Sequence, residues 1–303
     1  MTLIKDEDLL SYNLQGIIPG PQETEEAFLE RAAYCKGLQN QPVEESLGPL
    51  PCTDSESAKE LLLEAFKITD PVYCIQPLWM PMAFSNYKLA PWHGGCAWIF
   101  QAHEDSPTGA FMQLRKQFRH RKKYLGIYRR DELIAHELSH VGRMMYAEPQ
   151  FEELLAYRSS FSSWRRWFGP IVQAPWESLL FMLSLLLLLV LDLYLQAMGE
   201  IGTYRLLLWA KLFPITLLFL GLFRVWRRHQ VFNRCLGNLN KCCPDAKAAN
   251  AVAYRLTDAE IYKFAGSTSD FIVEYAKTES STSLRWRLIK AAYFGARSIR
   301  QRS

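Results

Sequence analysis

Two long apolar segments dominate the pattern of hydrophobic and polar positions along this chain. They cover residues 176–198 and 204–226, and each would be roughly 34 Å long as a helix, enough to cross a hydrocarbon core of about 30 Å. The run 185–191 is apolar on every side and tryptophans flank both segments, which favours lipid over the core of a soluble protein. Only five residues separate the two segments, so they must run antiparallel. The pattern predicts a two-helix transmembrane hairpin within residues 171–228.

Basic residues around the hairpin predict its orientation. Arg165 and Arg166 precede the first segment and Arg224, Arg227 and Arg228 end the second, whereas the connecting loop has one acid and no base. Lysine and arginine are enriched on the cytoplasmic side of membrane proteins. The seven cysteines show no CxxC spacing, which suits free thiols in a reducing compartment. We expect an integral membrane protein with two spans whose N- and C-terminal parts both face the cytoplasm.

One acid and one base lie inside the predicted spans. Asp192 is near the end of the first span and Lys211 near the start of the second, so an antiparallel hairpin places them at similar depth. An unpaired charge in hydrocarbon is costly, and we therefore expect the two side chains to pair. The alternative is that each side chain extends separately toward the membrane surface.

Helix-terminus signals organise the rest of the chain. Residues 24–37 predict a helix ending in glycine, and the spacing of serine or threonine before glutamate predicts capping boxes at Ser57 and Thr257. A linker rich in proline and polar residues covers 39–54. The best strand candidates are residues 96–101 and 124–128.

Charge is distributed unevenly behind the net value of +4. Residues 1–70 hold fourteen acids and five bases, whereas residues 115–130 and 284–303 hold bases and no acid. Solvated helix faces are one interpretation. The alternative is contact with anionic lipid headgroups, where each base near the surface contributes on the order of 1 kcal/mol. We find no nucleic-acid-binding motif and expect no nucleic-acid partner.

The motif with the clearest chemistry is ELIAHELSHVGRM, residues 132–144. His136 and His140 are four residues apart, so a helix places both imidazoles on one face, where they can bind one cation. Zinc binds histidine nitrogens at roughly 2.0–2.1 Å and, in hydrolytic sites, keeps one position open for water. Glu137 can take the proton as that water attacks a peptide carbonyl, then pass it to the leaving nitrogen. The spacing predicts a zinc site with Glu137 as the catalytic base.

The neighbouring residues favour a metal site over coincidence. Apolar residues occupy the other faces of this helix, which we expect to begin near Asp131 as its N-cap. Two histidines and a glutamate buried there without partners would be costly, and a metal ion provides the partners. A lone histidine on an apolar face is usually a core residue, but two at this spacing around a glutamate usually are not.

Residues 135–160 resemble the gluzincin clan of zinc peptidases, in which a second helix follows the HExxH helix. That second helix donates a glutamate with alanine or serine three residues on. Here Pro149 breaks the chain between two helical stretches, and Glu153 followed by Ala156 fits the spacing. The resemblance implies that Glu153 is the third zinc ligand, with Glu152 as its nearest rival.

A helix followed by a membrane hairpin is also similar to the CAAX prenyl endopeptidase type, whose third glutamate follows the hairpin in an ExxxD context. Glu260 and Glu274 follow the hairpin here but lack an aspartate four residues on. Both stay open as alternatives for the third ligand. The clan resemblance also implies an edge strand that binds extended substrate, for which 96–101 and 124–128 are the candidates.

Pattern and resemblance together predict a mostly α fold with a small β component. It would comprise a zincin-like α+β catalytic domain and the two-helix transmembrane hairpin. The expected regions are an acidic helical N-terminal region (1–70), the metallopeptidase domain (71–170), the hairpin (171–228) and a basic helical cytoplasmic region (229–303).

The first functional hypothesis is a membrane-anchored, cytoplasm-facing endopeptidase that uses Zn²⁺. Its substrates would be membrane-proximal proteins or peptides, because the histidine helix lies shortly before the first span. A group that stabilises the oxyanion is expected beside the zinc, and the candidates are Tyr146, Tyr157, Arg158 and His93. The alternative hypothesis is a non-catalytic, membrane-anchored interaction or scaffold protein with a structural histidine helix.

Overall fold

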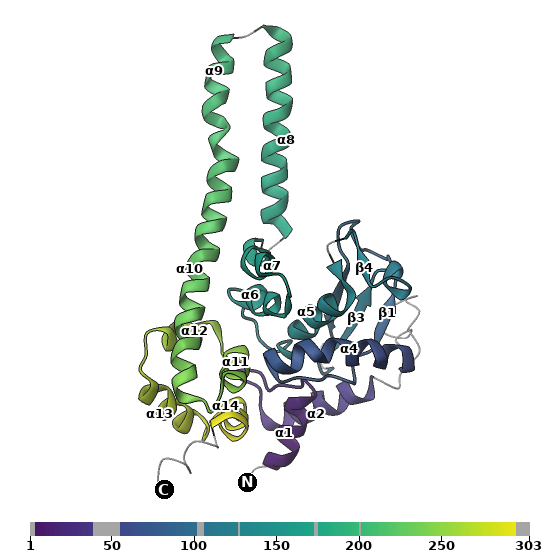
Figure 1. Cartoon of the computed structure of the whole chain (residues 1–303), viewed down its shortest axis with the longest axis vertical. Coiled ribbons are helices and arrows are strands. Elements are labelled where there is room, and N and C mark those ends of the chain that lie inside the picture. Colours follow the sequence, from purple (N-terminus) through teal and green to yellow (C-terminus); the bar gives the residue numbers. More distant parts are fainter. Residues whose placement is uncertain are drawn as a thin grey trace.

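The computed structural model describes residues 4–38, 55–101, 106–126, 128–172, 175–199 and 201–294. It is mostly helical (66%) with a small sheet component, which confirms the predicted fold class at that level. Two long antiparallel helices rise from a body of shorter helices and strands (Figure 1).

A three-stranded sheet forms one part of the body. Its strands are β1 (Met82–Phe84), β2 (Gly95–Phe100) and β3 (Gly109–Leu114), in the order β1-β3-β2. β1 pairs with β3 in parallel and β2 pairs with β3 antiparallel, with Ala97 opposite Met112. The strand predicted at 96–101 is confirmed to within one residue, and it lies at an edge of this sheet.

Residues 124–128, predicted as one strand, form a hairpin instead. β4 (Lys123–Tyr124) and β5 (Tyr128–Arg129) pair antiparallel, with Tyr124 opposite Tyr128. Leu125 and Gly126 have φ angles of 51° and 71°, the left-handed region that reverses the chain. The prediction of a continuous strand is wrong because this Leu-Gly pair makes a turn.

In the described part of the chain before the sheet, the helices are α1 (Asp6–Leu14), α2 (Glu25–Gly37) and α4 (Ser55–Tyr73). The hydroxyl of Thr24 accepts a hydrogen bond from the N–H of Ala27, which caps α2, and this helix ends at glycine as predicted. The helix start predicted at Ser57 is wrong by two residues, because α4 begins at Ser55. The predicted linker 39–54 lies outside the described residues.

One hydrophobic core joins these helices to the sheet and to α5 (Arg130–Gly142), the helix of the histidine motif. Phe28 of α2, Leu62 of α4 and Met112 of β3 are all buried in it. The boundary predicted at residue 70 falls inside α4. The apolar face of α5 is buried in the same core through Leu133, Ile134, Leu138 and Val141. The position of the histidine motif is therefore fixed by the core.

A second core holds the C-terminal part of the chain. Its elements are α10 (Leu212–Cys242), α11 (Ala246–Tyr254), α12 (Asp258–Ala265), α13 (Ser269–Glu279), α14 (Leu284–Ile289) and a π-helical turn (Lys290–Phe294). Phe151 and Leu155, at α6 (Glu152–Ala156), belong to this core as well. The capping box predicted at Thr257 is confirmed, with both of its hydrogen bonds to Glu260 present.

The helical hairpin consists of α8 (Pro175–Met198), α9 (Ile201–Ala210) and the first half of α10. Two helices, Trp176–Met198 and Gly202–Cys242, are long and apolar enough to cross a membrane. Only 6% of the apolar window of the first is buried, so this helix is not the core helix of the body. Nζ of Lys211 lies 3.0 Å from Oδ1 of Asp192 on the facing helix, which confirms the predicted pair.

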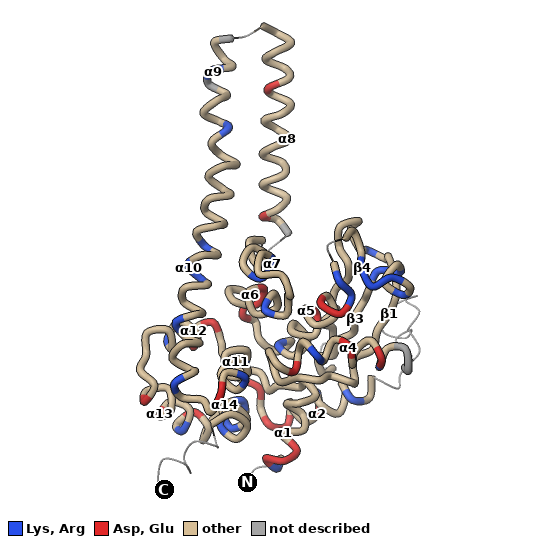
Figure 2. Tube along the Cα trace, in the orientation of Figure 1, with Lys and Arg blue, Asp and Glu red and all other residues tan. Residues whose placement is uncertain are grey.

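Charged residues gather in separate parts of the structure (Figure 2). Acids cluster on α1, whereas lysine and arginine surround β4 and occupy the body-side half of α10. Arg297, Arg300 and Arg302 of the basic C-terminal block lie outside the described residues. α7 (Ser163–Phe168) and a 3₁₀ turn (Gly169–Ile171) connect the body to α8.

Candidate metal centre

α5 presents the histidine motif, although it begins one residue before the position predicted. Its N-cap is Arg129, and Asp131 lies in the first turn, where its carboxylate pairs with Arg129 at 2.7 Å. The prediction that Asp131 is the N-cap is therefore wrong. An acid in the first turn still interacts favourably with the helix dipole.

His136 and His140 converge as the four-residue spacing predicts. Their Nε2 atoms are 3.3 Å apart, and their side chains are 15% and 17% exposed. Burial lowers the pKa of His136 well below its ordinary value, and the charge of His140 lowers it further. The pair thus offers two nitrogen donors at a partly accessible position, one of them strongly biased to the neutral form that binds metals.

α6 brings the carboxylate of Glu153 to the two histidines. Its Oε2 atom lies 3.7 Å from Nε2 of His136, and its Oε1 atom lies 3.6 Å from Nε2 of His140. The hydroxyl of Tyr73 anchors the end of α6 by donating to the carbonyl of Leu155 at 2.6 Å. Glu153, His136 and His140 form a group in which one donor atom from each lies within 4.8 Å of the others.

Glu152 faces the other side of His140 and positions it. One carboxylate oxygen of Glu152 lies 3.0 Å from Nδ1 of His140, and the other accepts from Nε of Arg143 at 2.7 Å. Burial by itself would lower the pKa of His140, but the hydrogen bond and charge of Glu152 raise it to about 9. A carboxylate on the second nitrogen of a ligating histidine fixes the ring and increases its basicity.

Arg143, which sequence reasoning missed, ties this network to the C-terminal helices. Its guanidinium is buried and donates to the carbonyls of Tyr254 and Leu256, the latter at 3.0 Å. Burial disfavours the charge of Glu152, yet Arg143 and His140 together lower the pKa of Glu152 below its ordinary value. Glu152 therefore stays ionised and contacts His140 on the side of the ring away from Nε2. Glu153 is the carboxylate that faces both Nε2 atoms.

Glu137 lies between α5 and the edge strand β2. Its Oε2 atom accepts a hydrogen bond from the backbone N–H of Ala97 at 2.8 Å, and only 9% of the residue is exposed. Burial raises the pKa of Glu137 above its ordinary value, against the opposing effects of His140 and the Ala97 N–H. A carboxylate with a raised pKa binds a proton more readily, as a general base requires.

The donor set is one that could hold a metal ion, such as a tetrahedral zinc ion. Ligand atoms at about 2.0–2.1 Å from such an ion lie about 3.3 Å from one another. The two Nε2 atoms, 3.3 Å apart, match that edge length, and one donor atom from each of the three residues lies within 4.8 Å of the others. Two imidazoles and one carboxylate, with a fourth position left for water, is a composition found in hydrolytic zinc sites.

Only one of the four predicted oxyanion candidates lies at the histidine pair. Tyr157 packs against His136 with ring centroids 4.7 Å apart, and burial raises its pKa to about 12. Tyr146 donates to the carbonyl of Arg255 and Arg158 donates to Asn250, so both serve the packing of α11. His93 lies in the loop before β2, where its carbonyl accepts a hydrogen bond from Arg115.

Glu260 and Glu274, the alternative third ligands, lie elsewhere. Glu260 forms a buried ion pair with Arg285, and Glu274 is exposed and paired with Lys277. Arg165, which the sequence indicated only as a basic residue before the first span, lies close to the site. It pairs with buried Glu132 at 2.9 Å and influences the pKa of His136.

Comparisons of this chain with protein-family models, with curated proteins and with solved structures find no match.

Proposed function

We propose that this chain is a membrane-anchored, zinc-dependent endopeptidase with a zincin-like catalytic domain. The observation that carries the proposal is the convergence of His136, His140 and Glu153, with Glu137 on the same helix as the histidines and hydrogen-bonded to the edge strand. The zinc ion would be held by the two Nε2 atoms and the Glu153 carboxylate. When bound, it would supply Lewis acidity to a peptide carbonyl and to a nearby water molecule.

Glu137 is the proposed general base. Its position beside the histidines allows it to take a proton from water and then to protonate the leaving nitrogen. The hydrogen bond from Ala97 holds the carboxylate in place against β2. Tyr157, which touches His136, is the proposed partner of the developing oxyanion, because a phenol with a raised pKa keeps its proton to donate.

The edge of β2 is the proposed substrate platform. Among the described strands β2 pairs with β3 alone, so its other edge offers backbone groups to an extended peptide. A peptide strand added at that edge would lie on the side of β2 where Ala97 contacts Glu137, next to the proposed general base. The substrate class that follows is an extended segment of a protein or peptide.

The hairpin is proposed to lie in the bilayer with both soluble parts in the cytoplasm. The basic residues of α7, which precedes α8, and of the body-side half of α10 support this orientation, and they suit anionic headgroups. The catalytic helix would then be close to the membrane, so membrane-proximal proteins are the expected substrates.

Zinc content and peptide cleavage together test the proposal. The full chain, purified in detergent, is compared with Glu137→Gln and His140→Ala, and with His120→Ala as a matched control on an exposed histidine. Zinc is measured by mass spectrometry and cleavage on a library of proteome-derived peptides. We expect about one zinc per wild-type chain, zinc without cleavage in Glu137→Gln, and neither in His140→Ala.

Two outcomes would contradict the proposal. Full cleavage by Glu137→Gln would remove its role as base. Zinc bound by wild type with no cleavage of any peptide would favour the alternative, a non-catalytic membrane-anchored scaffold in which the hydrogen bond between Glu137 and Ala97 ties α5 to the sheet.

A further inference from the structure

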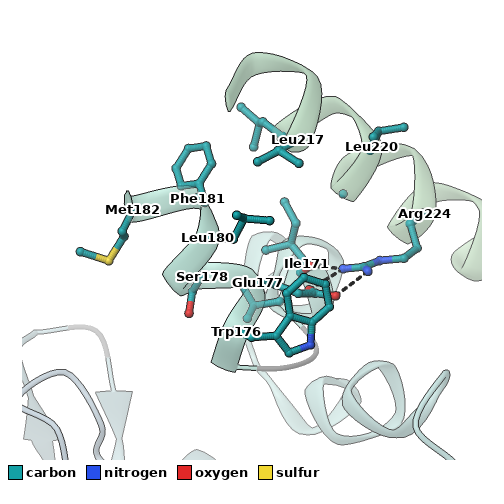
Figure 3. Close-up of a pocket in the computed structure, with 13 residues that line it drawn as sticks. Ile171, Trp176, Glu177, Ser178, Leu180, Phe181, Met182, Leu217, Leu220 and Arg224 are labelled. Atoms are coloured by element: carbon teal, nitrogen blue, oxygen red, sulfur yellow. Dashed lines mark hydrogen bonds and ion pairs between the residues drawn. The ribbon is translucent and has the colours of Figure 1, made fainter. Parts of the chain in front are cut away.

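A groove of about 430 Å³ lies between α8 and α10 where the hairpin meets the body. Figure 3 shows its walls, which are mainly apolar and include Leu180, Phe181, Leu217 and Leu220, with Ile171 between the helices. Gly221 leaves space in the α10 wall, because a Cβ added there would meet only Ile171, at 3.4 Å. The apolar surface of the two candidate spans therefore extends into the groove between them.

The body-side end of the groove is charged. Arg224 donates to both carboxylate oxygens of Glu177, at 2.7 Å each, and to the carbonyl of Ile171 at 2.9 Å (Figure 3). Glu177 thereby neutralises Arg224. Arg227 and Arg228, within the next turn of α10, lie outside the lining of the groove and carry two further positive charges, and Arg227 is exposed and makes no hydrogen bond or ion pair with any described residue. The part of α10 that follows the groove is therefore positively charged.

We propose that this groove binds a phospholipid, with one acyl chain between α8 and α10 and the phosphate at the arginine end. The inference rests on the bilayer location proposed above and is independent of catalysis. The excess positive charge complements a phosphate, and Trp176 at the same end is a residue type that lies at membrane interfaces.

The volume of the groove favours a lipid chain over a protein helix as its occupant. A partner helix about 10 Å wide and 30 Å long has a volume on the order of 2000 Å³, several times that of the groove. A cavity of about 430 Å³ is instead in the range of small-molecule sites. A single hydrocarbon chain is therefore the occupant that matches both the volume and the apolar walls.

Lipid titration of the full chain tests the proposal. Delipidated protein in detergent is titrated with dioleoyl phosphatidylglycerol, and bound lipid is counted by native mass spectrometry. We expect one saturable lipid per chain. Gly221→Leu should weaken binding about tenfold, because the added side chain takes the space of about two methylene groups of the acyl chain. Inorganic phosphate alone should not compete.

Matched variants keep the test independent of folding defects. Gly202→Leu adds the same side chain to the hairpin where nothing lies within 4 Å, so it should bind lipid like wild type. Arg227→Gln alters an exposed residue and should weaken binding severalfold through loss of the phosphate contact. Circular dichroism checks that each variant keeps its helix content.

Three results would overturn the inference: equal binding by wild type and Gly221→Leu, no saturable lipid, or a dimer that fills the groove with a second copy. Failure of the bilayer proposal has a different signature. In that case alkaline carbonate would release the chain from membranes, whereas a chain that resists extraction and binds no lipid disproves only the lipid site.

Discussion

The ring of Tyr157 packs edge-on against the imidazole of His136, with centroids 4.7 Å apart and an interplanar angle of 67°. Gly169 lies against the same tyrosine ring, and a Cβ added at Gly169 would collide with Cδ1, Cε1 and Cγ of that ring. The turn before the hairpin therefore packs against the ring of Tyr157, and that ring contacts His136, a proposed metal ligand.

Replacing Gly169 with alanine should push Tyr157 away from His136. We expect Gly169→Ala to lower the free energy of unfolding by about 1–3 kcal/mol, as overpacking does, and to weaken zinc binding. Tyr157→Phe keeps the ring and should retain most of the stability. Thermal unfolding of detergent-solubilised protein and zinc titration measure both effects.

Gly237→Ala is the control for this substitution. Nothing lies within 4 Å of a Cβ at that position in α10, so alanine should be neutral or stabilising by up to about 1 kcal/mol. If Gly169→Ala unfolds at the same temperature as wild type, the tyrosine ring adapts freely and the proposed support of His136 is absent.

Glu152 should tune metal affinity without being a ligand. In Glu152→Gln, His140 loses its carboxylate partner and the buried Arg143 loses its counter-charge. We expect zinc affinity to fall about 10–100-fold, the usual cost of losing an outer partner of a ligating histidine. Competition with a chelator measures it. Glu274→Gln, on an exposed former candidate, should bind like wild type; a loss there would mean that the ligand set is wrong.

The parts that could be predicted from the sequence depend on residues close together in the chain. The face shared by His136 and His140 follows from helix periodicity, and the capping box at Thr257 from a four-residue pattern. The apolar length of the hairpin is a local property as well. The turn at Leu125 and Gly126 is also a local feature, but the aromatic residues on either side of it led to the prediction of a strand.

The support of the site could not be predicted, because its partners are distant in sequence and are often backbone groups. Glu137 accepts from the N–H of Ala97, and Arg143 donates to carbonyls of α11 and its C-terminal loop. Such groups have no side-chain signature. The distinct roles of Glu152 and Glu153 likewise depend on how α6 is rotated against α5, which only the fold determines.

Asp192 and Lys211 should stabilise the hairpin as a pair. Asp192→Ala leaves a cation without its partner in the apolar hairpin and Lys211→Ala leaves an anion, so each should lower the melting temperature of protein in lipid nanodiscs. The exchange Asp192→Lys with Lys211→Asp restores opposite charges at the same depth. We expect the exchanged protein to recover at least half of the decrease in melting temperature that the single variants show. An exchanged protein that melts no higher than either single variant would show that pairing contributes nothing.

A buried ion pair between Glu260 and Arg285 holds the C-terminal helices together. Arg285 donates to both oxygens of the Glu260 carboxylate at 2.8 Å, and the indole N–H of Trp286 donates to it at 2.7 Å. Burial by itself would raise the pKa of Glu260, but the hydrogen bonds and charge of Arg285 lower it below its ordinary value. The ionised form is therefore favoured in the folded state.

This lowered pKa predicts how stability depends on pH. A carboxyl group in the unfolded chain has a pKa of about 4.3, so the stabilisation from Glu260 should be fully present above that pH and lost as pH falls through the lower folded value. Glu260→Gln should therefore be less stable than wild type near neutral pH, and the difference should shrink in acid. Urea unfolding of both proteins from about pH 7 to pH 3 measures it, with Glu274→Gln as the exposed control. A difference that stays constant over this range would mean that Glu260 has the same pKa folded and unfolded, and that the ion pair with Arg285 does not form in solution.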